Sequence, residues 1–533
     1  MKTARVSIAA ALLLVAAACP RPAGALALGG TGGQPFAGPG ARPSPASIAV
    51  SVDSAHPGAV IPSSFLGLSM ETPAVDSPAI TSSSAPALAQ LMRELGPGVL
   101  RISGVSVDRT QWMGAPEQPA PWRIATITPA DLRNLASLMS ATGWRLLLGL
   151  NLGHPVAQSL IEEARAASAI LGGSLAGVAL GNEPDLYTRP VSAPFRALLG
   201  TGALRAPEWG PSAYESEITS LRAALAAAGV QPALYGPDTA SPAWLEGYAA
   251  QQGPGLAALA QHFYPLGRCH AGRLLKAGPS LASLLGRRVA LHEARRIAAY
   301  VRVAASHGLP LRIDEANSVS CAGQPHTSDT FAAALWAVDF SLIAAHVGAV
   351  GVNFHGGLGS CSLGGTIASP WYSPLCALPG GQLHARPEYY ALLLLRSLEG
   401  CAFVPAAYGT SRDVAVYALR AHDGSLRVVI DDKEAPASGR SGRRARSPAP
   451  VLVALRANRS YVRASVVRLS APSASAREGV RFGGASVGAD GSFAAPAPEA
   501  LGGAPGSFVV TVRPASVAVV TLAAGAASVA SRR

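Results

Sequence analysis

The sequence predicts an α/β protein: a (β/α)8 TIM barrel followed by a C-terminal β-sandwich domain that an N-terminal strand completes. Eight short apolar runs alternate with segments of helical periodicity, and the runs are almost continuously apolar, as in strands buried on both faces of a parallel sheet. After residue 401 the helical periodicity gives way to short runs separated by Gly, Pro, Ser and Asp, which is typical of a sandwich. A doubly wound open sheet is the structural alternative, and it is disfavoured because no Gly-rich dinucleotide loop follows the first strand.

Length and composition allow a large core. The chain has 533 residues, of which 49% are hydrophobic, which is enough for two domains. Its formal net charge of +12 would indicate a nucleic-acid surface if the basic residues formed a stripe with interleaved aromatics. Instead, several arginines fall in one stretch, residues 433–446, which we interpret as a disordered insertion, with a patch for an acidic glycan as the alternative. No nucleic-acid partner is expected.

The first 27 residues have the pattern of a secretory signal peptide. Two basic residues, an apolar run too short to span a bilayer and a stretch of small residues predict cleavage after Ala25 or Ala27. Cys19 resembles a lipoprotein acceptor site, but Ala16 stands where a larger residue is usual, so lipid anchoring is the weaker alternative. No other stretch is long and apolar enough for a transmembrane helix. We expect a secreted, periplasmic or cell-surface protein, with a flexible Gly/Pro/Ala-rich linker over residues 28–46.

A strand-then-helix rhythm fills residues 57–400, the predicted barrel. The expected strands are 65–70, 99–103, 145–150, 176–180, 233–236, 259–263, 311–313 and 350–354. The helices that follow them are expected at 86–95, 129–142, 156–171, 212–228, 242–251, 293–306, 328–346 and 387–398. Thr128 and Asp131 form a capping-box variant before the second helix, and many of the helices end at a Gly where a left-handed C-cap is required.

Residues 401–523 are predicted to form the β-sandwich, followed by a disordered tail at 524–533. The runs that predict its strands are 414–419, 426–430, 451–455, 465–469 and 508–514. One further strand, within residues 47–56, precedes the barrel without a helix of its own. We expect it to add an edge to the sandwich.

Two carboxylates follow buried strands of the barrel. Residues 176–184, AGVALGNEP, end an apolar run in Glu183, and residues 310–318, PLRIDEANS, end another in Glu315. Because the C-terminal ends of barrel strands share one pocket, these two acids suit retaining glycoside hydrolysis, in which one protonates the leaving oxygen and the other attacks. One alternative is that Asn182 and Glu183 cap a helix. Another is a metal site, which lacks a helical His pair or the additional acids that magnesium prefers.

Several segments resemble one family of glycosidases. GNEP after the fourth strand and the Glu that ends the seventh resemble the clan of retaining barrel glycosidases, clan A. Residues 313–340, IDEANSVSCAGQPHTSDTFAAALWAVDF, are similar to the nucleophile segment of glycoside hydrolase family 79, the β-glucuronidase and heparanase family. LRISG at 100–104, HFYP at 262–265 and NFHGG at 353–357 also resemble family segments, as does the layout of a barrel and a sandwich.

The resemblance implies roles for individual residues. Glu183 would be the acid/base, Glu315 the nucleophile, and Asn182 a partner of the sugar 2-hydroxyl. Tyr264 would orient the nucleophile, and Glu71 would contact hydroxyls of the sugar. The structural alternatives are a buried aromatic for Tyr264 and a helix cap for Glu71.

Recognition of a uronic carboxylate is expected mainly after the eighth strand. The resemblance places His355 and Tyr372, on the loop after that strand, near the carboxylate. The sequence offers further neutral donors, which are the backbone amides of Gly356 and Gly357 and the hydroxyl of Ser320. A purely structural histidine is the alternative for His355. No Arg or Lys stands beside Glu315 or Asn353 in the sequence apart from Arg312, which predicts recognition without a cation against the nucleophile.

Three features depart from the family pattern. Ser320 stands where the β-glucuronidases usually have a Tyr that holds the carboxylate, Val105 stands where a polar residue is common, and residues 358–381 form an insertion. The expected protein is therefore a secreted retaining β-glycosidase without cofactor or metal, with exo-acting β-glucuronidase as the leading activity. A β-glucosidase, β-xylosidase or α-arabinofuranosidase and a non-catalytic carbohydrate-binding protein are the alternatives.

Five cysteines remain once the signal peptide is removed, and their spacing matches no zinc site. Cys361 and Cys376 lie in one local insertion and are predicted to pair, because closing so short a loop costs little entropy. Cys269 and Cys321 follow neighbouring strands and are the next expected pair, which leaves Cys401 as a buried free thiol.

Overall fold

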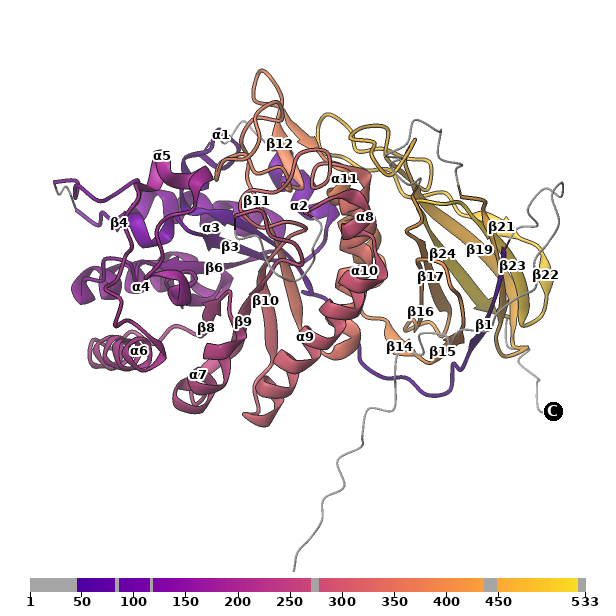
Figure 1. Cartoon of the computed structure of the whole chain (residues 1–533), viewed down its shortest axis with the longest axis horizontal. Coiled ribbons are helices and arrows are strands. Elements are labelled where there is room, and N and C mark those ends of the chain that lie inside the picture. The colour runs from indigo at the N-terminus through magenta and orange to yellow at the C-terminus, as the bar shows by residue number, and fades with distance from the viewer. Residues whose placement is uncertain (1–45, 82–85, 116–117, 270–277, 436–447, 526–533) are drawn as a thin grey trace, which may run out of the picture.

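The computed structural model describes residues 46–81, 86–115, 118–269, 278–435 and 448–525. Figure 1 shows a barrel and a β-sandwich side by side. The signal peptide, the linker before Ala46, the arginine-rich residues 436–447 and the last eight residues lie outside the described residues. No helix in the described part of the chain combines the length and apolar character needed to cross a membrane.

Eight parallel strands close the barrel among the described residues, which confirms the predicted architecture and makes the open-sheet alternative wrong. In barrel order they are β2 (Leu66–Glu71), β3 (Val99–Ser103), β6 (Arg145–Leu150), β7 (Leu175–Leu180), β8 (Leu234–Thr239), β9 (Leu256–Phe263), β10 (Leu311–Ala316) and β11 (Gly351–Gly356). Their side chains are almost all buried, because the barrel interior and the surrounding helices cover both faces of each strand.

Seven of the eight surrounding helices begin and end within three residues of their predicted bounds, and α9 begins six residues before its predicted start. They are α2 (Ala87–Glu94), α3 (Pro129–Thr142), α4 (Ala157–Leu171), α6 (Pro211–Ala227), α7 (Leu245–Gln252), α9 (Arg287–Ser306), α10 (Phe331–Val347) and α11 (Pro387–Arg396). Short elements decorate the barrel: α1 (Pro78–Thr81), β4 (Thr110–Trp112), β5 (Ala125–Ile127), α5 (Arg196–Leu199), α8 (Leu281–Leu284), β12 (Leu375–Ala377) and β13 (Leu383–Ala385). Thr128 and Asp131 form the predicted capping box of α3, and Gly143 ends the helix at φ 72°.

Helix α10 is buried on all sides, as its uniformly apolar sequence requires. It packs against α9 and α11 of the barrel and against β17 (Leu426–Asp432) of the sandwich, and Figure 1 shows it on the side of the barrel that faces the sandwich. Its one buried acid, Asp339, accepts a hydrogen bond from Tyr417 at 2.6 Å and pairs with Lys433. These contacts join the two domains through a shared core.

The sandwich consists of two sheets. One has the order β15 (Ala406–Tyr408), β1 (Ala46–Val52), β18 (Val451–Arg456), β23 (Ser507–Val512) and β22 (Gly503–Ala504). The other has the order β14 (Ala402–Val404), β16 (Val414–Arg420), β17, β24 (Ser516–Ala524), β19 (Tyr461–Ser470) and β20 (Arg481–Phe482), with β21 (Glu499–Leu501) beside β19. The N-terminal strand β1 thus completes the sandwich, but the expectation of an edge position is wrong. It lies between β15 and β18 and hydrogen-bonds to both, because its buried Ile48 and Val50 fill the core between the sheets.

Strand β10 is longer than its apolar run suggested. It was predicted to end at Ile313 and continues to Ala316, so that Asp314 and Glu315 are strand residues with buried side chains. Two acids can lie inside a strand only where opposite charge and hydrogen bonds compensate for their lost hydration.

Both disulfides in the described part of the chain join the predicted partners, Cys269 with Cys321 and Cys361 with Cys376. Cys401, at the barrel–sandwich junction, is a buried free thiol.

One buried acid in the barrel wall gives a test of this packing. Burial raises the pKa of Glu163 in α4 to about 8, whereas an unfolded Glu ionises near pH 4.5. Between these two values the folded state keeps a proton that the unfolded state has lost, so stability falls as pH rises. Glu163 is therefore expected to lower the free energy of unfolding by on the order of 2 kcal/mol as the pH rises from 5 to 8. Glu163→Gln should abolish this decrease, measured by urea unfolding at both pH values. Glu162→Gln, on the same helix, is the control, and an equal effect of both changes would contradict the assignment.

Candidate active site

A cavity of about 380 Å³ opens at the C-terminal end of the barrel strands. Its polar lining comes from the ends of six strands and the loops that follow them. These residues include Glu71 (β2), Asp108 and Arg109 (after β3), Asn182, Glu183, Tyr187, Arg189 and Ser192 (after β7), His262 and Tyr264 (β9 and after), Glu315 and Ser320 (β10 and after), and His355 and Tyr372 (β11 and after). Strand ends of a parallel barrel are where this fold places its reactive groups.

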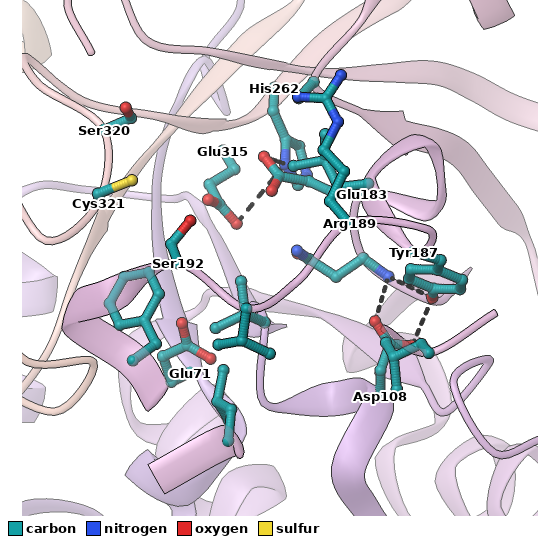
Figure 2. Close-up of a pocket in the computed structure, with 18 of the residues that line it drawn as sticks. Glu71, Asp108, Glu183, Tyr187, Arg189, Ser192, His262, Glu315, Ser320 and Cys321 are labelled. Atoms are coloured by element: carbon teal, nitrogen blue, oxygen red, sulfur yellow. Dashed lines mark hydrogen bonds and ion pairs between the residues drawn. The ribbon is translucent and has the colours of Figure 1, made fainter. Parts of the chain in front are cut away.

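The two acids predicted to be catalytic meet in this cavity. One oxygen of Glu183, one oxygen of Glu315 and a ring nitrogen of His262 all lie within 4.8 Å of one another. Figure 2 shows both carboxylates turned toward the same space, with His262 beside them. Carboxyl groups roughly 5 Å apart suit a retaining mechanism, because inversion needs a wider gap for a water molecule.

Both oxygens of Glu315 are held by buried donors. Tyr264 donates from its hydroxyl to Oε1 at 2.8 Å, and Arg101 donates from Nη1 to Oε2 at 2.8 Å. Burial acts to raise the pKa of Glu315, but the neighbouring His355, His262 and Arg101 together hold it well below its ordinary value. Glu315 is therefore an ionised carboxylate with fixed orientation, which is the state that a nucleophile requires.

Arg101 is the cation that sequence reasoning missed. Its guanidinium is fully buried and contacts Asp238 at 3.1 Å, Asp314 at 3.2 Å and Glu315 at 2.8 Å. The prediction that no cation stands against the nucleophile is therefore wrong, because Arg101 comes from β3, across the barrel from β10. The available signal was the arginine of the LRISG segment, a charged residue inside an otherwise apolar strand.

The second carboxylate, Glu183, lies in a strained position. Its backbone is left-handed at φ 49° and ψ 53°, which costs a non-glycine residue roughly 1–3 kcal/mol. The Glu183 amide donates to the carbonyl of Asp238 at 2.8 Å, and the Leu186 amide donates to the Glu183 carbonyl at 2.8 Å. The side chain is partly open to the cavity, with Oε1 3.2 Å from Nδ1 of His262. Glu183 is the N-cap residue of the short 3-10 turn Pro184–Leu186, as the helix-cap alternative expected, but its side chain makes no cap hydrogen bond and lines the cavity.

The oxygen and the nitrogen of the Asn182 side-chain amide differ in their hydrogen bonding. Its Oδ1 accepts from Arg101 Nη2 at 2.9 Å, which fixes the orientation of the amide. Its buried Nδ2 has no hydrogen-bond partner among the described residues. Since a buried donor without a partner is costly, this group is available to an oxygen in the cavity, as expected for a contact with a sugar hydroxyl.

Glu71 also lies in the cavity, although it is the N-cap residue of the short 3-10 turn Thr72–Asp76. Its Oε2 accepts from the amide of Ser106 at 2.9 Å and from the Ser106 hydroxyl at 2.5 Å, and it makes no cap hydrogen bond. His355 approaches the other oxygen, with Nε2 3.6 Å from Oε1. Gly104 stands directly against this carboxylate at φ 73°, so any side chain there would overlap Glu71.

Only some of the residues predicted to bind a uronic carboxylate lie in the cavity. Ser320, His355 and Tyr372 line the cavity, but Gly356 and Gly357 are not among the described residues that line it. The Gly357 amide donates to Ser373 at 2.8 Å, which contradicts the expectation that it is free for substrate. The 358–381 insertion causes this, because its residues 368–374 pack directly on the two glycines.

Another part of the lining could not be predicted from sequence. Tyr187 donates to Asp108 at 2.6 Å, and the amides of Leu152 and Gly153 donate to the same carboxylate. Burial raises the pKa of Asp108 to about 6. This network anchors the loop that follows Glu183, residues 184–205, over the cavity. Its apolar residues have no helical or strand periodicity, so the sequence contained no signal for their position.

Two groups of acids and His262 have a spacing that could suit a cation: Glu183 with Glu315, and Asp238 with Asp314. Arg101 contacts Asp238, Asp314 and Glu315 and already supplies the positive charge that these carboxylates need. The donor set therefore fits a guanidinium-centred ion cluster, and we assign it no metal.

Comparison with known proteins supports this reading of the fold. No family model matches the chain. A β-glucuronidase of Neurospora crassa is 31% identical over 203 residues, so the match spans 36% of this chain and about a third, 35%, of that relative. A 4-O-α-L-rhamnosyl-β-D-glucuronidase from Fusarium oxysporum 12S superposes with a TM-score of 0.70 at 19% identity, covering 89% of this chain and 100% of the other.

The family 51 arabinofuranosidase from Xanthomonas axonopodis pv. citri superposes with a TM-score of 0.62 at 13% identity, over 90% of this chain and 100% of the other. The predicted resemblance to β-glucuronidases is thus confirmed over part of the sequence, and the predicted fold over nearly all of the described chain.

Proposed function

We propose that this protein is a retaining β-glycosidase, with Glu315 as nucleophile and Glu183 as acid/base, and that its substrate is a β-glucuronide. The observation that carries the proposal is the pair of carboxylates within 4.8 Å, only one of which is held by two strong donors. Such unequal environments allow two glutamates to differ in protonation state, so that one can act as an acid and the other as a nucleophile.

In the first step, a Glu315 oxygen forms a bond to the anomeric carbon while the bond from that carbon to the leaving oxygen breaks. Glu183, protonated, transfers its proton to that leaving oxygen, and a covalent glycosyl–Glu315 ester remains. In the second step Glu183, now a carboxylate, takes a proton from water, whose oxygen displaces Glu315. Tyr264 and Arg101 hold Glu315 in the attacking orientation, and Asn182 Nδ2 is placed to bind a sugar hydroxyl.

The β-glucuronide specificity rests on the partial sequence match and on hydrogen-bond donors in the cavity. Ser320, Tyr372 and His355 present hydroxyl and imidazole groups there, and a uronic carboxylate needs several such donors. The secretory signal pattern supports a location outside the cytoplasm, where the enzyme would act on the terminal sugar of conjugates or glycans. The test is turnover of a nitrophenyl β-glucuronide beside the β-glucoside, β-xyloside and α-arabinofuranoside. Faster turnover of the β-glucoside, β-xyloside or α-arabinofuranoside would show that this sugar, and not the glucuronide, is the preferred substrate. No turnover of any of the four would support a carbohydrate-binding protein.

A residue-level prediction follows from Ser320. Its hydroxyl is too short to reach as far into the cavity as a tyrosine would, so we expect only a modest preference for the glucuronide over the glucoside. Ser320→Tyr is expected to increase that ratio of kcat/KM about tenfold, the value of one hydrogen bond to a charged group. Ser320→Phe is the matched control, because it adds the ring without the donor. An equal increase with both variants would show that shape, and not a hydrogen bond, sets the preference.

A further inference from the structure

One wall of the cavity is apolar, and the proposed chemistry makes no use of it. The loop of residues 184–205 contributes side chains that line this wall: Leu186, Val191, Phe195, Leu199 and Leu204. These side chains offer no hydrogen-bond partners, so sugar hydroxyl groups packed against them would lose hydration without compensation. The wall therefore suits a ligand part that is itself apolar.

The position of this loop assigns the wall to the leaving-group side. It begins directly after Glu183, the residue that must touch the leaving oxygen, and its first residue that lines the apolar wall is Leu186. The loop is fixed close to Glu183: Trp209 donates from Nε1 to the Pro184 carbonyl at 2.8 Å, and the Leu204 amide donates to the Tyr187 carbonyl at 2.8 Å. A group attached to the leaving oxygen has to lie against it.

One buried cation of the same cavity, Arg109, lacks a partner among the described residues, whereas Arg189, which also lines the cavity, is exposed. Arg109 is only 9% exposed and lines the cavity, yet its side chain forms no hydrogen bond or ion pair with any described residue. Its neighbour Asp108 is occupied by Tyr187 and by backbone amides. Burial lowers the pKa of Arg109, as expected for a guanidinium without a close counter-ion. It is open to an acceptor oxygen that enters from the cavity.

We propose that the cavity accepts a glycoside whose leaving group is a flat, apolar ring system with a carboxylate or carbonyl oxygen that Arg109 binds. The substrate class is thus an aromatic conjugate and not an internal bond of a polysaccharide. The volume of about 380 Å³ is near the lower end for small-molecule pockets, and it suits one sugar with one ring system. This proposal rests on the proposed glycosidase function.

The test compares three leaving groups on one common sugar: methyl, 2-naphthyl and 6-carboxy-2-naphthyl. Phe195→Ala is expected to lower kcat/KM about tenfold for both naphthyl glycosides and less than twofold for the methyl glycoside. Arg109→Gln is expected to lower it about tenfold for the carboxylated glycoside alone. Leu198→Ala is the matched control, because Leu198 lies on the same loop but is 48% exposed and is not among the described lining residues.

Equal losses on all three glycosides, or no loss with either variant, would overturn the proposal. A second measurement separates it from the proposed function: calorimetric titration of the full-length protein with 6-hydroxy-2-naphthoic acid, the free leaving group. Binding that weakens about tenfold with Phe195→Ala and with Arg109→Gln, but not with Leu198→Ala, supports the site even if no glycoside is hydrolysed. Absence of binding to the unmodified protein would refute it even if glycosides are hydrolysed.

Discussion

Glu315→Ala is expected to lower kcat/KM by on the order of 10⁵-fold with every glycoside, because no covalent intermediate can form. Glu183→Ala is expected to behave differently. A nitrophenolate leaves without much protonation, so its release should slow only modestly, whereas release of an alkyl or sugar leaving group should slow by several orders of magnitude. The contrast between the two variants, measured across leaving groups, tests the assigned roles.

Glu315→Gln and Glu183→Gln are the matched controls, since they keep the shape and remove the charge. Their thermal unfolding should show that the barrel is intact. Proton NMR of the first-formed product should show retained anomeric configuration. Inversion, or equal losses for the two variants across all leaving groups, would refute the assignment of Glu315 as nucleophile.

Arg101→Met is expected to lower the free energy of unfolding by about 3–5 kcal/mol, together with nearly all activity. The arginine is fully buried and contacts Asp238, Asp314 and Glu315, so its removal takes away the guanidinium that these three buried carboxylates share. Without Arg101 these acids bind protons more tightly in the folded state, so the loss of unfolding free energy should be greater at pH 8 than at pH 5, measured by urea unfolding at both pH values.

Arg133→Met serves as the control for this variant. Arg133 is an exposed arginine of α3, and its replacement should change stability by less than about 0.5 kcal/mol. A small effect of Arg101→Met at pH 8 would mean that the acids are already protonated in the folded protein. In that case Arg101 would not hold Glu315 as an anion, and the low pKa of Glu315 would depend on His355 and His262 instead.

Much of the fold could be predicted because its signals are local. Alternation of apolar runs with capped helices such as 129–142 depends on neighbouring residues, and β1 was recognised as a sandwich strand from its alternation. The place of β1 within its sheet was not predictable, because strand order depends on pairing with β15 and β18, more than 350 residues away in the chain. Likewise β10 was predicted too short, because its acids are compensated by an arginine from another strand.

For the site, the sequence by itself determined which strands end in carboxylates, and therefore that Glu183 and Glu315 open onto one face of the barrel. It also determined the disulfide partners, since each pair lies in one insertion or after neighbouring strands. Only the tertiary structure decided which groups surround those carboxylates. Arg101 reaches Glu315 across 214 positions of sequence, and the insertion after β11 closes over Gly356 and Gly357. The physical reason is that charge compensation and packing act through space, between side chains whose distance in the chain carries no information about their contact.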